Sequence, residues 1–429
     1  MSAIIPAVTV GPGQGPSTAT KEPRAVAVGP ADERTAGAGG AGPLDTYANN
    51  PPGGGQRAER RRSRLRARRV LWRESSLKRV RACGRTATDA QGVALVVSEG
   101  APGERIAGYR GVATCGSVWA CPRCSVVIAE RRAQELREGL SGWGRRGGAV
   151  VLLTLTMRHH RGQSLDELWD GLASTWSRLM AGRPWKAFKA AAGLVGTLRV
   201  VEVTHGAAGW HAHIHALLFL DPAQGRRFAT VGGADSEFEA HFAAISARVP
   251  VLASWRNLLR GRGFDAVEAA QDMRPVSLSA AGTELDRYFT KGSWDAAAEV
   301  TKGPSKRGST GSRTPMQILA DFVATGDADD LDLWREWEAG SERRRQMTWS
   351  RGFKRELGLT DVSDEEVAAE HRGDEAVLML SALQWRVVRE SALYWLLLER
   401  AEACDDLSEL GGWLDSAAER ALVDRPRAG

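Results

Sequence analysis

Three of the eight histidines fall within five residues, in the segment Trp210–Phe219, WHAHIHALLF. On a β-strand the side chains at positions i, i+2 and i+4 share one face, so His211, His213 and His215 would project together. Three protonated imidazoles would repel one another, but neutral imidazoles suit a bound cation. The alternative is a surface strand with incidental histidines. We interpret the pattern as a metal site.

Histidines alone do not complete the shell of a metal ion, and a carboxylate is the natural further ligand. Glu202 lies on the preceding predicted strand of the same hairpin. An ordinary exposed glutamate is the alternative for this position. The spacing does not fix which two of the three strand histidines coordinate.

The chain has four tyrosines: Tyr47, Tyr109, Tyr288 and Tyr394. Tyr288 lies in the segment ELDRYFTK, and on a helix it would share one polar face with Glu284 and Lys291, at i, i+4 and i+7. A lysine ammonium beside a phenol favours the phenolate. A generic amphipathic helix is the alternative. We predict that these three residues are catalytic, with Tyr288 as the nucleophile.

These residue types suit the cleavage of a phosphodiester. A metal ion can polarise the phosphodiester and offset the charge of its transition state. A tyrosine oxygen can capture the phosphoryl group covalently, which conserves the bond energy for later rejoining. The sequence contains no G-x4-G-K-[ST] segment, so we expect no P-loop motor in this chain.

Four cysteines form a second candidate metal site. Cys115, Cys121 and Cys124 are closely spaced, and Cys83 precedes them. In a reducing compartment such a set binds Zn²⁺ more often than it forms disulfides. Buried free thiols are the alternative. The fifth cysteine, Cys404, is isolated in an apolar helical segment and is predicted to be core.

Basic charge is concentrated near the N-terminus. Residues 56–86 carry 13 Arg and Lys against 2 Glu, while the whole chain has a net charge of +6. We predict a basic arm over residues 56–82 that contacts DNA phosphates; a solvated helix or linker is the alternative. Its DNA-binding candidates are Arg60, Arg61, Arg62, Arg64, Arg66, Arg68 and Arg69. Residues 1–55 are rich in Gly and Pro and are predicted to be a disordered tail.

The hydrophobic pattern alternates between strands and helices without a regular βαβ order. It predicts a helix over Ser125–Leu140, a buried strand over Ala149–Met157, a helix beginning after Ser164, and a hairpin of Val195–Thr204 with His211–Leu220. Further helices are expected near 235–260 and 280–294. We therefore predict an α+β fold with a central antiparallel sheet flanked by helices.

The remaining boundaries follow from composition. Residues 83–145 would hold the cysteine cluster and a helix, residues 146–320 the domain that carries the histidines and Tyr288, and residues 321–429 an acidic stretch followed by a mainly helical region. A single long helix is expected over Glu375–Glu402. The sequence has no run of 18 apolar residues and no secretory signal pattern. We expect a cytoplasmic protein with no membrane partner.

The motifs together resemble those of rolling-circle replication initiators, which belong to the His-hydrophobic-His (HUH) endonuclease superfamily. The resemblance is carried by VLLTLTMRHH, by HIH followed by ALLFL, and by the later Tyr288 with Lys291. It is closer to replication proteins of small high-GC Gram-positive plasmids, over about 80–360, through CGSVWACPRC, GWHAHIH, RYFTK and WSRGFKREL. In conjugative relaxases the tyrosine precedes the histidines, and the order here differs.

The resemblance implies that histidines bind Mg²⁺ or Mn²⁺ and that Tyr288 attacks the origin strand and keeps its 5′ phosphate. Ile214 favours His213 and His215 as the coordinating pair. Glu284 matches relatives that use a glutamate to hydrolyse DNA at termination. His159 and His160 end the first motif and could bind metal, position DNA or simply be exposed. The implied partners are plasmid origin DNA, single-stranded at the nick with a duplex or hairpin nearby, and the host helicase and replication machinery.

Two other functions fit the same sequence. One is a transposase of the same endonuclease superfamily. The other is a non-catalytic, zinc-stabilised DNA-binding regulator whose histidines are structural. Formation of a covalent protein–DNA adduct separates the two enzymes from the regulator, and a plasmid replication assay separates the initiator from the transposase.

Overall fold

The structure is a computed structural model, and it describes residues 54–99, 105–223, 234–276, 311–369, 375–391, 393–404, 406 and 408–423. The chain divides into two units, Met1–Pro51 and Pro52–Gly429, and all of the described residues belong to the second. Except for residues 54 and 55, the predicted disordered tail lies outside the described residues. Among the helices that the structure describes, none combines the length and apolar character that a membrane span requires.

Five antiparallel strands form the larger sheet, in the order β6-β3-β5-β4-β7. They are β3 (Ala149–Thr156), β4 (Leu194–Gly206), β5 (Gly209–Leu220), β6 (Asp272–Val276) and β7 (Met347–Trp349). The predicted hairpin is β4 with β5, and only residues 207 and 208 separate the paired Gly206 and Gly209. Gly209 has φ +90°, a conformation that only glycine adopts readily. The prediction of an α+β fold built on an antiparallel sheet is confirmed.

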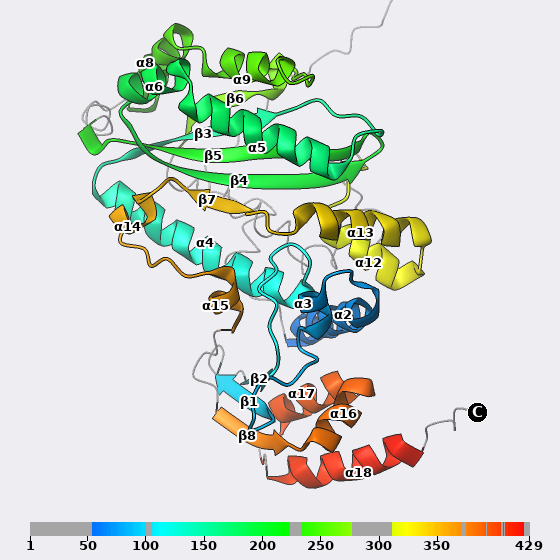
Figure 1. The fold of residues 1–429 in the computed structure, drawn as a ribbon. Helices are drawn as coiled ribbons and strands as arrows, with labels where there is room; N and C mark the ends of the chain where they lie inside the picture. The colour runs from blue at the N-terminus through cyan, green and yellow to red at the C-terminus, as the bar shows by residue number, and fades with distance from the viewer. Residues whose placement is uncertain are drawn as a thin grey trace, which may run out of the picture. The chain divides into compact units, whose positions relative to one another are not determined.

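Helices pack on both faces of this sheet (Figure 1). One layer contains α5 (Leu165–Ala181), α6 (Arg183–Ala192), α8 (Ala234–Arg248) and α9 (Val251–Arg260), and the other contains α4 (Pro122–Arg145) and α14 (Phe353–Glu356). The alternation of β5 places Ala212 and Ile214 in the first layer, whereas Leu217 and Phe219 pack with Trp143 of α4. His213 and His215 lie on the same face of β5 as Leu217 and Phe219, but closer to the start of the strand.

A smaller sheet of order β2-β1-β8 was not predicted. It consists of β1 (Val93–Glu99), β2 (Arg105–Arg110) and β8 (Glu375–Leu380), and it packs with α16 (Ala382–Glu390), α17 (Leu393–Ala403) and α18 (Glu409–Val423). The single helix expected over Glu375–Glu402 is therefore wrong. Its first residues pair with β1, because a short apolar run fits a strand as well as a helix when a partner strand is present. The Ser381 side chain caps the start of α16.

The remaining elements are α2 (Gly54–Glu74), α3 (Lys78–Ala82), the 3-10 helix η1 (Glu268–Ala270), α12 (Pro315–Thr325), α13 (Ala328–Ser341) and α15 (Asp364–Ala369). Helix α2 contains most of the predicted basic arm. Helix α13 packs beside the β4–β5 hairpin, where the rings of Trp337 and Trp210 stack with centroids 5.9 Å apart. A helix more than 100 residues after the histidines in the sequence therefore helps to hold the histidine strand in place.

Candidate functional site

The β4–β5 hairpin brings Glu202, His213 and His215 together. Glu202 lies directly opposite His213 in the strand register, and His215 lies two residues further along β5. Glu202 Oε2 is 3.1 Å from His213 Nε2 and 3.6 Å from His215 Nε2. One possible ligand atom from each side chain lies within 4.8 Å of the others. The three residues form one compact group that could hold a metal ion, as the sequence pattern indicated.

Thr154 of the neighbouring strand β3 orients one of these histidines. Thr154 pairs with His215 in the register, and its Oγ1 lies 3.1 Å from His215 Nδ1. If Nδ1 carries the proton and donates it to Thr154, then Nε2 keeps its lone pair on the side of Glu202. A neutral imidazole in this tautomer is the form that binds a metal ion.

The donor set fits a divalent cation. Two imidazole nitrogens and one carboxylate oxygen on one side of an ion leave its other positions for water or substrate. The side chains of Glu202, His213 and His215 are 11%, 13% and 7% exposed, so the group lies close to the surface without being freely solvated. The arrangement resembles a catalytic metal site more than a closed structural one.

His211, the remaining strand histidine, lies outside this group. Its ring stacks on that of His159, with centroids 4.8 Å apart and planes 17° from parallel. Burial, followed by the proximity of His213 and His159, lowers the pKa of His211 to about 4. Burial also lowers the pKa of His159. The structure thus brings His213 and His215 together with Glu202 and pairs His211 with His159 instead.

The predicted catalytic residues Glu284, Tyr288 and Lys291 lie outside the described residues. Two of the other tyrosines are in the interior. Tyr109 donates a hydrogen bond to the Tyr394 carbonyl oxygen at 2.7 Å, and burial holds the pKa of Tyr109 well above its ordinary value. Tyr394 packs against Trp72 in the same core. Neither tyrosine can reach a DNA strand from this core.

The four predicted zinc ligands also meet. Cys83 follows α3, Cys115 lies in the loop after β2, and Cys121 and Cys124 begin α4. All four are buried, and their sulfur atoms lie close enough to hold one ion. Hydrogen bonds from the neighbouring thiols lower the pKa of Cys83. Cys404 lies apart, half-buried after α17.

The spacing of the sulfur atoms fits zinc. The Cys83 Sγ is 3.6 Å from Cys121 Sγ and 3.8 Å from Cys124 Sγ, and Cys115 Sγ is 3.7 Å from Cys124 Sγ. Four sulfurs about 2.3 Å from a tetrahedral ion would lie roughly 3.8 Å from one another. A disulfide would need two sulfurs about 2.05 Å apart. The cluster is therefore arranged as four separate thiol ligands.

Several arginines of the predicted basic arm form contacts within the protein. Arg61 contacts Glu402, Arg62 Nη2 donates to Glu399 Oε2 at 2.9 Å, and Arg69 donates to the Ser391 carbonyl oxygen at the end of α16. Arg68 is 5% exposed. The prediction that Arg68 contacts DNA phosphate does not fit this position, because the side chain is enclosed between α2 and α17.

Arg68 instead links the cysteine cluster to the smaller sheet and its helices. Its Nη2 donates to the Cys83 carbonyl oxygen at 2.8 Å, and Tyr394 Oη lies 3.4 Å from its Nη1. Burial lowers the pKa of Arg68. The nearby Tyr394 and cysteine sulfurs raise this pKa by more than burial lowers it, so the pKa of Arg68 lies above its ordinary value. Arg60, Arg64 and Arg66 remain predicted phosphate contacts, and Arg66 is exposed.

Sequence reasoning missed two features of the site. One is Thr154. In the segment VLLTLTM it lies on the same face of β3 as Thr156, the other threonine of the strand. The other is the run Arg343–Arg345 before β7, which lies beside the Glu202 end of β4 because Val201 N donates to the Gln346 carbonyl oxygen at 2.9 Å. Three consecutive arginines were visible in the sequence, but only strand pairing reveals their neighbours.

Comparisons with known proteins agree with the sequence analysis. Residues 109–229 match the family model described as replication protein. The chain is 26% identical over 380 residues to a Streptomyces lividans protein named Protein rep, covering 72% of this chain and 79% of that protein. It is 32% identical over 135 residues to a Streptomyces cyanogenus protein named Neomycin resistance protein, covering 26% and 31%. No solved structure matches this chain.

The matched segment 109–229 contains β3, β4 and β5, and with them Glu202, His213 and His215. It also contains three of the four clustered cysteines. The resemblance to plasmid replication initiators of high-GC Gram-positive bacteria is thereby confirmed.

Proposed function

We propose that this protein initiates rolling-circle replication by cutting one strand of its plasmid origin, with Tyr288 as the nucleophile. Glu202, His213 and His215 would hold a divalent cation, Mg²⁺ or Mn²⁺. The observation that carries the proposal is that these three donors converge within the segment that matches the replication protein family. A protein that only bound origin DNA would have no evident use for a partly buried set of metal ligands.

The reaction would be a transesterification. The Tyr288 oxygen attacks the scissile phosphorus, the bond from phosphorus to the 3′ oxygen breaks, and that oxygen takes a proton. The products are a 5′-phosphotyrosine and a free 3′ hydroxyl from which a polymerase can extend. When bound, the cation would polarise a phosphodiester oxygen and offset the developing negative charge. Lys291 would favour the Tyr288 phenolate.

On this proposal the cysteine cluster holds structural Zn²⁺. It joins α3, the loop after β2 and the start of α4, and thus fixes the helix that packs on the histidine face of the sheet. Strand separation would be supplied by the host helicase and replication machinery, because the sequence contains no P-loop. The partner DNA would be single-stranded at the nick.

The test is a search for a covalent adduct. The full chain is incubated with single-stranded DNA from its own plasmid origin and Mn²⁺, and adducts are resolved on a denaturing gel. We expect a shifted band that EDTA prevents and that Tyr288→Phe abolishes, with DNA binding unchanged. The matched control is Tyr47→Phe, which makes the same chemical change in the N-terminal tail. An adduct formed by Tyr288→Phe would contradict the assignment of the nucleophile.

Glu284 gives the proposal a second test. A carboxylate one helical turn from Tyr288 could accept a proton from water, so that the second cleavage at termination proceeds by hydrolysis. We expect Glu284→Ala to nick at a near-normal rate but to leave products longer than one plasmid unit in a replication assay. Asp286→Ala serves as the control. If Glu284→Ala yields normal single-stranded circles, Glu284 has no role in termination and another group accepts the proton.

A further inference from the structure

A cavity of about 900 Å³ lies beside the β7 edge of the larger sheet, lined by α4, by the segment from residue 342 to β7, and by α15. Three exposed arginines line it: Arg343, Arg345 and Arg351. Within the part of the chain that the structure describes, none of these three forms an ion pair. The other five basic residues of the lining each contact a carboxylate; Arg132, for example, lies 2.6 Å from Asp364.

The charge of the lining is concentrated at these arginines. Eight basic and six acidic residues line the cavity, a net of +2. Four of the six carboxylates are neutralised by ion pairs with the lining residues themselves. The three arginines without ion pairs thus provide guanidinium groups for a ligand that carries several negative charges.

Strand β7, which lines the cavity, pairs with the strand that carries Glu202, although Glu202, His213 and His215 do not themselves line the cavity. Val200 pairs with Met347 across β4 and β7, and Val201 N donates to the Gln346 carbonyl oxygen. Continuing this antiparallel register by one residue brings Arg345 level with Glu202. In Figure 1, β7 lies next to β4, with α4 on the far side of β7. The arginines before β7 therefore lie near the part of β4 that carries Glu202.

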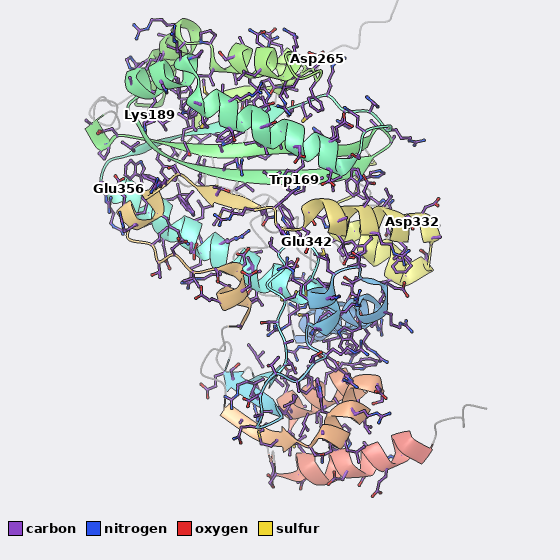
Figure 2. The ribbon with its side chains drawn as sticks, in the orientation of Figure 1. Trp169, Lys189, Asp265, Asp332, Glu342 and Glu356 are labelled. Carbon is purple, nitrogen blue, oxygen red and sulfur yellow. The ribbon has the colours of Figure 1, made fainter. Side chains whose placement is uncertain are left out.

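The loop that carries the arginines begins at the end of α13 and is held in a defined position. Among the described residues, Arg343 is the one non-glycine residue with a positive φ, +63°. Arg343 is the second residue after α13, and a left-handed residue commonly ends a helix at this position. Arg344 anchors the loop to α5 through Asp166 and Asp170, both at 2.8 Å. Figure 2 labels Glu342, where this loop leaves α13.

We propose that this cavity binds the phosphates of the single DNA strand adjoining the scissile phosphate. The inference rests on the proposed function, because it places the reacting strand at Glu202. A cavity of about 900 Å³ is the size of a small-molecule site and admits a few nucleotides of one strand rather than a duplex. Arginine contacts of this kind supply affinity without reading sequence.

The test measures binding without cleavage. Fluorescence anisotropy of a 5′-fluorescein oligothymidylate of about 20 nucleotides is followed in EDTA at several salt concentrations. The test variant is Arg343→Gln/Arg345→Gln/Arg351→Gln in the full chain. Each phosphate contact on a single strand contributes about −0.7 to the slope of log K against log salt, so we expect the slope to flatten by about 2 and affinity near 0.1 M salt to fall by roughly tenfold to a hundredfold.

The matched control is Arg178→Gln/Arg183→Gln/Arg262→Gln, which removes the same charge from exposed positions in the opposite helix layer. An equal change of slope in both triple variants, or none in the cavity variant, would overturn the proposal. If the cavity variant does not fold, as judged by circular dichroism, Arg351→Gln alone should flatten the slope by about 0.7, and an unchanged slope would equally overturn the proposal.

Because this assay needs no metal and no origin sequence, its outcome is independent of nicking. If the cavity variant binds DNA more weakly and the wild type forms no adduct, the proposed phosphate-binding cavity is supported and the proposed nicking activity is contradicted.

Discussion

The histidine group and the cysteine cluster are both candidate metal sites, but they differ in donors and exposure. Four sulfurs surround the cysteine site, and all four residues are buried. The histidine group offers two nitrogens and one carboxylate oxygen, and two of its three residues are only half-buried. Closed four-ligand sites are typical of structural zinc, whereas catalytic sites keep a position open for substrate.

The two sites also differ in the elements that form them. The cysteines come from three separate segments that an ion would join. The histidine group comes from one hairpin that strand pairing already holds in register. We therefore expect loss of the cysteine site to unfold local structure, and loss of the histidine site to abolish chemistry while the fold persists.

Cys124→Ser should have the largest effect of any substitution on stability. It leaves three thiol ligands in a buried site, and structural zinc in small domains contributes roughly 10 kcal/mol or more to folding. We expect the free energy of unfolding to fall by about 5 kcal/mol, measured by urea denaturation followed by circular dichroism. Cys404→Ser is the control and should be nearly neutral. Equal stability of both variants would show that the cluster consists of free thiols.

His213→Ala should act on activity instead. Metal stabilisation of the transition state is worth several kcal/mol, and about 4 kcal/mol corresponds to roughly a thousandfold in rate. We expect adduct formation to slow by that factor while the free energy of unfolding changes by less than about 1 kcal/mol. His241→Ala, an exposed histidine of α8, controls for the substitution itself. If His213→Ala unfolds as readily as Cys124→Ser, the two sites do not differ as proposed.

Arg68→Gln tests the charge balance of the cysteine site. Zinc with four thiolates carries two units of negative charge, and Arg68 is the buried cation beside it. Breaking a buried charge interaction by removing one partner costs about 3 kcal/mol or more. We expect a loss of that size in urea denaturation. Arg66→Gln, exposed on the same helix, should stay within about 0.5 kcal/mol of wild type, and a comparable loss there would assign the effect to α2 itself.

The sequence was most informative where one element supplied the whole pattern. The alternation of His211, His213 and His215 predicted a strand face, and the hairpin placed Glu202 on it. The cysteines were predicted from thiolate chemistry and from the close spacing of three of them, although Cys83 is 32 positions before Cys115. These predictions depended on local periodicity and on ligand chemistry, which a single sequence carries.

The failures share one cause, which is partners distant in the sequence. β8 pairs with β1 across more than 270 residues, and nothing within Glu375–Glu402 signals that pairing. Arg68 has a polar, charged neighbourhood in sequence, but its contacts are Cys83 and Tyr394. The charge composition identifies a basic segment. Only the fold shows which of its side chains form contacts inside the protein and which can contact a ligand.

The smallest expected effect is at Thr154, and it tests whether the histidine site is built to bind metal. The Thr154 hydroxyl lies 3.1 Å from His215 Nδ1 and would fix the tautomer that leaves Nε2 free for a cation. Partners of this kind are typically worth 10- to 100-fold in metal affinity. We expect Thr154→Val to weaken Mn²⁺ binding by about tenfold in isothermal titration calorimetry, because the isosteric side chain keeps the packing but loses the hydrogen bond. Thr154→Ser keeps a hydroxyl and should recover most of the affinity, and adduct formation by Thr154→Val should approach the wild-type rate at saturating Mn²⁺. Identical Mn²⁺ affinities for the wild type, Thr154→Val and Thr154→Ser would contradict this role. The hydrogen bond would then only stabilise the sheet, and it would no longer be evidence that His215 is a metal ligand.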